Sequence, residues 1–360
     1  MARMPRMHSS PRLYSLACTI LGLICLSGRL AGQTPQPKVH RLEVTPDTVA
    51  YGYYWSEAKP VLRIPSGDII DVDTLLTNSP AGLTAAGVPD DKVEASLKAI
   101  TAAFPRGDPR RGPGGHVLTG PVYVEGAEPG DALEVKFLSI DLAIDYGYNG
   151  CSNHIAIDPC DRGTPGGTKI IPLDKKTMTA EFSPGIVIPL RPFYGSMGVA
   201  PAPELGRVSS NPPGKHAGNL DNKELVAGST LWIPVFVPGA LFEIGDSHAA
   251  QGDGEVDQTA IETSLRGKVQ LTVRKGMHLN FPRAETATDY ISMATDPDLR
   301  VAVTTAIQEM IDFLVQTRGL TTRDAYRLIS IAGNVAVTQI VDLPNVGAHV
   351  KMPKNIFKSK

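Results

Sequence analysis

Glycine and proline together set the strongest limit on what this chain can fold into. The 360 residues include 35 Gly and 30 Pro, and both residue types interrupt helices and favour turns. A helical bundle or a coiled coil is therefore disfavoured. Hydrophobic residues make up 42% of the chain and charged residues 20%, so the chain can bury a core and is not disordered. We expect a mainly β protein.

The overall charge excludes one class of partner. The formal net charge is −2. A protein that binds nucleic acid through the phosphates needs an excess of Lys and Arg to neutralise them. We therefore expect no nucleic-acid partner.

The first 32 residues have the layout of an export signal. Residues 1–12 carry three arginines and no acid, residues 13–26 are apolar, and small and polar residues follow. The apolar run is shorter than the roughly 20 residues that span a membrane as a helix. Cys25 would be the site of a lipid anchor, but the bulky Ile24 before it fits such a site poorly. The pattern predicts a signal peptide over 1–32, no stable membrane span, and a periplasmic or secreted mature protein.

Removal of the signal leaves two cysteines, Cys151 and Cys160, in a loop rich in Gly, Pro and Asn. In an oxidising compartment they predict a small disulfide loop, or else two free thiols. Zinc binding fits less well, because the two residues do not form a C-x-x-C pair.

Hydrophobic periodicity predicts mostly strands in the first two thirds of the chain. Apolar and polar residues alternate over 132–140, and apolar runs occupy 231–237 and 268–274. Residues 61–74 contain a Pro-Ser-Gly-Asp turn between apolar runs, which predicts a hairpin. Only 89–104 has the apolar spacing of a helix.

The last third of the chain changes character. Residues 296–319 and 321–333 predict two helices, each followed by a glycine or ending at one, and 335–341 predict a strand. We therefore predict a β-rich body over 33–275. An α+β part over 276–360 would complete the same catalytic unit.

The densest group of chemically active side chains lies in residues 238–263. Within ten residues it holds Asp246, His248, Gln251, Asp253 and Glu255. An extended strand would place Asp246 and His248 on one face. Glycines around the later residues allow a tight turn that returns them to the same point. Mixed oxygen and nitrogen donors suit Zn²⁺ or a similar divalent ion, whereas carboxylates alone would suit Ca²⁺. The alternative is a solvated acidic turn.

A second group lies in the Gly- and Pro-rich loop 212–225. It comprises Lys215, His216, Asn219 and Asp221. Loops on a rigid scaffold commonly carry function, although a turn with a surface histidine would have the same sequence.

Three further signals are weaker. Segment 114–131 contains His116, which is more often structural at the start of a strand, and Glu125, which a strand end would project. Asp68, Asp71 and Asp73 are either ligands or a solvated edge. Ser196 lies between glycines, but a serine nucleophile needs a nearby base, and the chain lacks the G-x-S-x-G, H-E-x-x-H and nucleotide-binding glycine motifs.

Three segments together resemble the acetamidase/formamidase family of amide hydrolases. The segments are HVLTGPVYVEGAEPGDALEV (116–135), PGKHAGNLDNKELVAGSTLWIPVFVPGALFEIGDSHAAQGDGEVDQTAIE (213–262) and DAYRLISIAGNVAVTQIVD (324–342). The resemblance extends from about residue 40 to about 352, and the GD-x-HA-x-QGDGE run is its most specific part.

The sequence departs from the family pattern in three places. Val117 stands where the family usually has Pro, and Ala217 where it has Gly. Asp257 and Gln258 stand where it has a small residue or Cys and then Gly. The last change adds a charge beside the expected site, so it bears on the substrate more than on the reaction.

The resemblance implies a jelly-roll-like β-sandwich with further β structure and a small α+β C-terminal part. It also implies hydrolysis of a short aliphatic amide, such as formamide or acetamide, to a carboxylate and ammonia. The resemblance further implies a small-molecule amide substrate, a homo-oligomer and an associated divalent metal, for which zinc is the expected ion.

A site hypothesis follows from the clustered loops and the resemblance. Asp246 and His248 would bind the metal, with His216 and Asp221 as further ligands. Either Glu255 or Glu125 would act as the general base for a metal-activated water. An oxyanion would be stabilised by one of two amides, those of Asn219 and Gln251.

Two other functions stay open at this point. One is a different metal-dependent hydrolase on the same fold, acting on a larger amide, an amidine or an ester. The other is an exported binding protein without catalysis, stabilised by Ca²⁺ in the acidic turn.

Overall fold

The computed structural model describes residues 36–151 and 167–358. The expected signal peptide over 1–32 and Cys160 lie outside these ranges, so both remain predictions. Cys151 is disulfide-bonded, and its partner lies outside the described residues. In the part of the chain that is described, no helix is long and apolar enough to cross a membrane.

The protein is mainly β, as expected, and its largest sheet has nine strands. In sheet order these are β1 (Val39–Leu42), β5 (Ile69–Thr74), β17 (Leu265–Arg274), β7 (Ala132–Leu142), β15 (Thr230–Pro234), β18 (Arg283–Glu285), β19 (Asp289–Asp296), β21 (Val346–Pro353) and β20 (Asn334–Gln339). The last four come from the predicted C-terminal part. The sheet therefore continues across the predicted boundary at residue 275.

A second sheet carries most of the site. Its strands are β14 (Ala217–Asn219), β12 (Phe193–Gly198), β16 (Phe242–His248), β6 (Val117–Val124) and β2 (Val49–Tyr51), with β4 (Leu62–Ile64) also paired to β6. A four-stranded sheet contains β8 (Tyr146–Gly150), β9 (Thr168–Asp174), β10 (Thr179–Ser183) and β11 (Ile186–Pro189), and β3 (Tyr53–Trp55) pairs with β13 (Arg207–Ser209).

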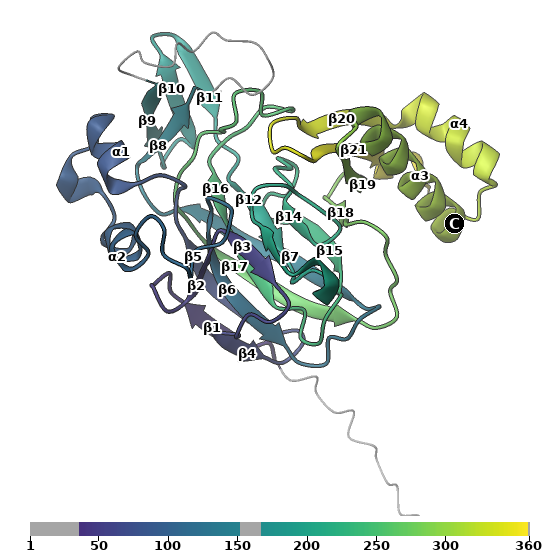
Figure 1. Cartoon of the computed structure of the whole chain (residues 1–360). Helices are drawn as coiled ribbons and strands as arrows, with labels where there is room; N and C mark the ends of the chain where they lie inside the picture. The colour runs from purple at the N-terminus through teal and green to yellow at the C-terminus, as the bar shows by residue number, and fades with distance from the viewer. Residues whose placement is uncertain (1–35, 152–166, 359–360) are drawn as a thin grey trace, which may run out of the picture. The chain divides into compact units, whose positions relative to one another are not determined.

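The two large sheets pack face to face (Figure 1). One hydrophobic cluster combines Ile70 and Phe137 of the nine-stranded sheet with Val122, Met197 and Ile244 of the six-stranded sheet. Because successive side chains of a strand point to opposite faces, each sheet contributes alternate residues to this shared core. The sandwich thereby gives a rigid support for the loops at its edges.

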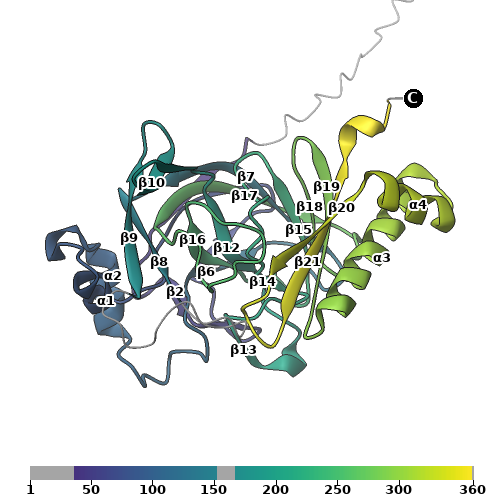
Figure 2. The same cartoon turned by 90° about the horizontal axis from the view of Figure 1, so that it is seen from above.

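The tail helices α3 (Leu299–Arg318) and α4 (Thr322–Ala332) flank the strands β19–β21 (Figure 2). Met310 and Leu314 of α3 share a core with Val350 of β21. The helix α3 begins later than predicted: its N-cap is Asp298, whose carboxylate accepts a hydrogen bond from Arg300 N, 2.7 Å away. It ends at Gly319, as predicted, in the left-handed conformation that favours glycine.

The predicted helix over 89–104 is divided. The structure has a 3₁₀ turn η1 (Asp90–Lys92) and the helix α2 (Ala95–Ala103), preceded by α1 (Pro80–Ala85). The expected apolar face is buried as predicted, at Val93, Leu97, Ile100 and Phe104. Two further 3₁₀ turns are η2 (Pro203–Leu205) and η3 (Lys354–Ile356).

The predicted hairpin over 61–74 is wrong. Both strands form, but β4 pairs with β6 and β5 pairs with β1 and β17. The turn between them therefore connects the two sheets of the sandwich. Each strand finds its partner far away in the sequence, which a local turn pattern does not indicate.

Candidate active site

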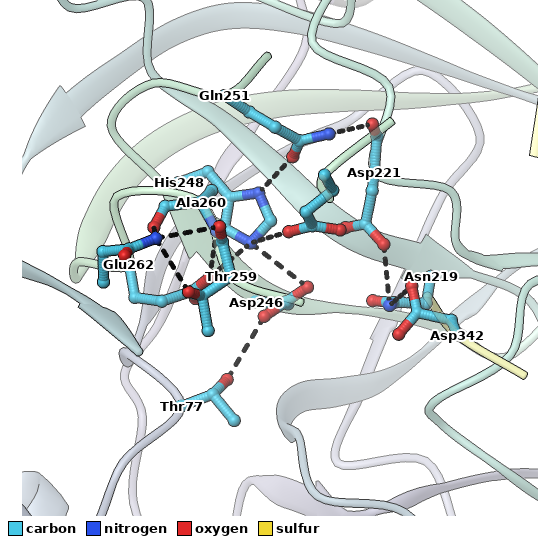
Figure 3. A network of polar contacts seen from close by, with 12 residues as sticks. Thr77, Asn219, Asp221, Asp246, His248, Gln251, Thr259, Ala260, Glu262 and Asp342 are labelled. Atoms are coloured by element: carbon cyan, nitrogen blue, oxygen red, sulfur yellow. Dashed lines mark hydrogen bonds and ion pairs between the residues drawn. The ribbon is translucent and has the colours of Figure 1, made fainter. Parts of the chain in front are cut away.

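A buried polar cluster forms where β12, β14 and β16 lie side by side (Figure 3). Strand β16 supplies Asp246 and His248, and strand β14 and the loop after it supply Asn219 and Asp221. Loops and strand ends elsewhere in the chain supply the remaining members: His116, Glu255, Glu262 and Asp342. No carboxylate residue of the cluster is more than 7% exposed. The site is thus assembled from four separate parts of the sequence, at residues 116, 219–221, 246–262 and 342.

Gly195 of β12 lies beside three side chains of the cluster, those of Asp221, Asp246 and His248. A Cβ at this position would lie 2.4 Å from Asp221 Oδ1, 2.5 Å from Asp246 Oδ2 and 2.7 Å from His248 Cε1. Any larger residue would occupy the space toward which these side chains point. Glycine is therefore required here by the side chains of the neighbouring strands.

Gln251 fixes the orientation of the His248 ring. Its Nε2 donates to the backbone oxygen of Asp221 at 2.7 Å, so its Oε1 faces His248 Nδ1 at 2.9 Å. Since Oε1 only accepts, Nδ1 carries the hydrogen and donates it. The other ring nitrogen, Nε2, is left to face the carboxylates. A second residue that sets a ligand histidine in this way is a common feature of metal sites.

Three carboxylates surround His248 Nε2. It lies 3.3 Å from Glu262 Oε1, 3.4 Å from Asp246 Oδ2 and 4.0 Å from Glu255 Oε1. Two triads, Asp221–His248–Glu255 and Asp246–His248–Glu262, have donor atoms within 4.8 Å of one another. Both triads share His248, so this imidazole is the centre of the cluster.

The cluster has more buried negative charge than the protein compensates. Asp221 Oδ1 and Glu262 Oε2 are buried and have no hydrogen-bond partner among the described residues. Burial, followed by the charge of Glu255, raises the pKa of Asp221 well above its usual value. Burial lowers the pKa of His248, but Glu262 and Asp246 outweigh it and raise that pKa. Buried carboxylates this close need protons or a cation. The donor set of carboxylates and one imidazole fits a divalent ion.

The backbone is strained at three of these carboxylates. Asp221, Asp246 and Glu255 have φ angles of 47°, 52° and 45°, a region that non-glycine residues adopt infrequently. Such conformations persist where the surrounding structure imposes them, and they concentrate at functional sites. They also mean that Asp246 and His248 are not arranged as in a regular strand.

His216, an expected ligand, lies outside this donor group. Its ring contacts Tyr54 edge-on, with 5.1 Å between ring centroids, and its Nε2 has no partner in the described part of the chain. The consecutive positive φ angles of Ala217 and Gly218, 69° and 74°, turn the chain between His216 and Asn219. The two side chains therefore do not share one face of a strand.

Glu125, one of the two expected bases, also lies away from the cluster. It is exposed in the turn after β6, whereas His116 at the other end of that strand lines the site. The eight residues of β6 separate these ends by roughly 25 Å at about 3.3 Å per residue. Glu255 is the expected base that the structure brings to the cluster.

Both expected oxyanion donors are already engaged. Asn219 Nδ2 donates to Asp221 Oδ2 at 2.8 Å and to Asp342 Oδ2 at 3.0 Å, and the Gln251 amide bridges His248 and Asp221. In this structure the two amides position carboxylates and the imidazole.

Three cluster members were not predicted as site residues. His116 was interpreted as structural, yet its Nε2 lies 3.7 Å from Asp246 Oδ1. Glu262 and Asp342 fall at the ends of two segments that carry the family resemblance, although no local polar pattern distinguished them. Their place within segments that resemble the family was the only indication in the sequence.

The hydroxyl of Ser196 has a structural partner. Its Oγ lies 2.9 Å from the hydroxyl of Tyr54, and both residues are buried. Nucleophilic catalysis by this serine is therefore not supported.

The cluster opens into a cavity of about 230 Å³. Besides the carboxylates and His248, its walls include Thr77, Tyr148, Asn211 and Gln258. A small polar molecule fits a space of this size.

Comparison with known proteins identifies the family of this chain. Residues 113–210 and 206–359 match the Acetamidase/Formamidase family. The formamidase of Methylophilus methylotrophus is 27% identical over 324 residues, which cover 68% of this chain and 77% of that protein.

Solved structures give the same result. The acetamidase of Bacillus halodurans is 28% identical with a TM-score of 0.70, covering 88% of this chain and 98% of its own. The acetamidase of Yersinia enterocolitica is 25% identical with a TM-score of 0.73, covering 91% and 95%. This chain belongs to the acetamidase/formamidase family and is a hydrolase of the C–N bonds of linear amides.

Proposed function

We propose that the cluster converts a primary carboxamide, of the formamide and acetamide type, to a carboxylate and ammonia with the help of a bound divalent cation. Zn²⁺ is the ion we propose, held by Asp221, Asp246 and His248. The observation that carries the proposal is the convergence of these three side chains on one point beside Gly195. The central imidazole favours zinc over Ca²⁺, which prefers oxygen ligands alone.

The need for such an ion follows from the reaction. An unactivated amide is a poor electrophile, and ammonia is a poor leaving group. A divalent ion polarises a carbonyl and lowers the pKa of a bound water from about 15.7 to about 7. The remaining steps fall to side chains of the chain itself.

Glu255 is the residue we assign to proton transfer. It lines the cavity at 4.0 Å from His248 Nε2, and it is buried. Burial raises its pKa well above the usual value, and the attraction of His248 only partly offsets this. A carboxyl group of this kind can accept a proton from water and deliver it to the leaving nitrogen.

Other side chains hold the reacting groups in place. Thr77 Oγ1 donates to Asp246 Oδ1 at 3.2 Å, and Asn219 joins Asp221 to Asp342. Because Asn219 and Gln251 are engaged, the amides of Asn211 and Gln258, which line the cavity, are our candidates for donors to the substrate oxygen. Gln258 has a φ of 74°, a strained conformation of the kind found at functional sites.

The test combines ammonia release with removal of the metal. Purified protein should release ammonia from formamide or acetamide, lose this activity on thorough chelation and regain it with Zn²⁺. His248→Ala should abolish it. Full activity after chelation, or in His248→Ala, would rule out the proposed cation site.

We also propose that the mature protein is exported. The layout of residues 1–32 and a disulfide at Cys151 both suit an oxidising compartment. N-terminal sequencing of the protein from its native host should show a start near residue 33. An intact Met1 would contradict this.

A further inference from the structure

A second, larger cavity adjoins the one at the carboxylates. Its volume is about 530 Å³. Glu255 and Thr259 line both cavities, so the two adjoin at these residues. Formamide or acetamide needs no space beyond the smaller cavity, and the larger one therefore calls for another explanation.

The larger cavity has apolar walls from two parts of the fold. The four-stranded sheet contributes Ile171, Phe182 and Ile188, and the loop after β16 contributes Val256 and Ile261. Phe182 is 38% exposed, and Lys169 Nζ lies over its ring, 4.4 Å from the centroid. Cavities of roughly 300–1,000 Å³ with such walls are typical of sites for organic ligands.

The charged groups at this cavity already have partners within the protein. Lys223 Nζ lies 2.7 Å from Asp253 Oδ2. Asp257 Oδ1 accepts hydrogen bonds from Asn149 Nδ2 at 3.3 Å and from Thr259 N at 3.2 Å. Arg191 lies 3.8 Å from Glu224. The uncommitted surface is therefore apolar, and it suits a neutral group better than an ionic one.

We propose that the larger cavity binds a bulky apolar acyl group of the substrate, so that the enzyme prefers arylalkyl or long-chain primary amides to acetamide. This inference rests on the proposed amidase function. A phenyl or alkyl group seated there would bring its amide toward Glu255 and the carboxylate cluster. Burying such a group should raise kcat/KM roughly 10- to 150-fold, which is about 1.5–3 kcal/mol.

The test measures ammonia release from formamide, acetamide, hexanamide and phenylacetamide. It uses the mature chain, which begins near residue 33. We expect kcat/KM to be at least tenfold higher for phenylacetamide than for acetamide. Ile188→Trp would fill the cavity and should lower the phenylacetamide-to-acetamide ratio at least tenfold. Val187→Trp is the matched control. Val187 is next to Ile188 on β11, is 59% exposed and does not line the cavity, so the ratio should not change.

A second variant keeps the test decisive if Ile188→Trp does not fold. Phe182→Ala, at a partly exposed position of β10, removes the aromatic wall and should also lower the ratio. Hydrolysis of acetamide at least as efficient as that of phenylacetamide would overturn the inference and leave the proposed function intact. So would an unchanged ratio in the folded variants. If the protein released ammonia from none of the four amides, both this inference and the proposed amidase function would be overturned.

Discussion

Two groups of acidic residues in this protein have opposite environments. The cluster around His248 holds five carboxylates, and strand β5 with its preceding turn holds Asp68, Asp71 and Asp73. The β5 group lies among cations: Arg266 donates to both oxygens of Asp71 at 2.9 and 2.7 Å, and Arg41 binds Asp73. His40 lies 2.7 Å from Asp68.

The two groups differ in how the negative charges of their carboxylates are compensated. At β5 each carboxylate has a basic partner from the protein, and hydrogen bonds from Arg266 lower the pKa of Asp71. In the His248 cluster buried oxygens have no partner among the residues that are described. An acidic group therefore indicates a cation site when it is buried and lacks basic partners, and the number of acids alone is not informative.

The largest expected effect is a loss of amidase activity that occurs in the His248 cluster and not in the β5 group. Asp246→Asn keeps the shape of the side chain but removes a charge from the proposed cation site. We expect ammonia release to fall at least about 10³-fold, as for loss of a group essential to transition-state stabilisation. Asp71→Asn, the matched change on β5, should leave activity within twofold. Equal losses in the two variants would contradict the distinction.

A smaller effect is expected from filling the space at Gly195. In Gly195→Ala the new methyl group would lie within 2.4–2.7 Å of Asp221, Asp246 and His248. These groups must move, and displacement by about 1 Å can reduce catalysis about 10²-fold. Gly150→Ala is the control, because its nearest contact would be an ordinary 3.6 Å. Steady-state kinetics of both variants would show the difference, and normal activity of Gly195→Ala would contradict the convergence of donors there.

Two buried histidines extend the comparison to pH. Carboxylates raise the pKa of His248, whereas burial alone lowers the pKa of His216 to about 4. An unfolded histidine binds protons below about 6.5, so His216 stabilises the fold above that pH and this contribution is lost as the pH falls toward 4. The loss from pH 6 to pH 4 is about 2 kcal/mol.

Denaturant unfolding over this pH range tests the assignment. His216→Phe should show a correspondingly weaker loss of stability on acidification. His278→Phe, at an exposed position, should behave like the wild type. An unchanged pH dependence in His216→Phe would show that the fold does not lower the pKa of His216.

The smallest effect is expected at the β5 surface group. Arg266→Ala removes the partner of Asp71, but the arginine side chain is 52% exposed, and exposed ion pairs contribute little. We expect the melting temperature to fall by no more than about 3 °C, with the difference reduced at 1 M salt because of screening. A large drop, or loss of amidase activity, would show that this group has a larger role.

The sequence was informative where the chemistry is local. The spacing of Asp246, His248, Gln251 and Glu255 predicts a joint site, and these residues do meet in the structure. The apolar face of 89–104 and the end of α3 at Gly319 also follow from short-range patterns.

What escaped prediction depends on distant contacts. Asp342 joins the cluster through Asn219, more than a hundred residues away, and His116 enters it because β6 lies beside β16. His216 is turned away by left-handed backbone at the next two residues, and the turn before β5 connects two sheets instead of forming a hairpin. No local pattern encodes these relations, since they depend on strand pairing and packing.

The central claim is that a cation is held among Asp221, Asp246 and His248. Its most direct test is the metal content of purified wild-type protein and of Asp246→Asn, each equilibrated with Zn²⁺, freed of unbound ions and analysed by mass spectrometry. The account predicts about one tightly held zinc per wild-type chain and its loss in the variant. Metal-free protein with full amidase activity, or equal zinc retention in the variant, would contradict it.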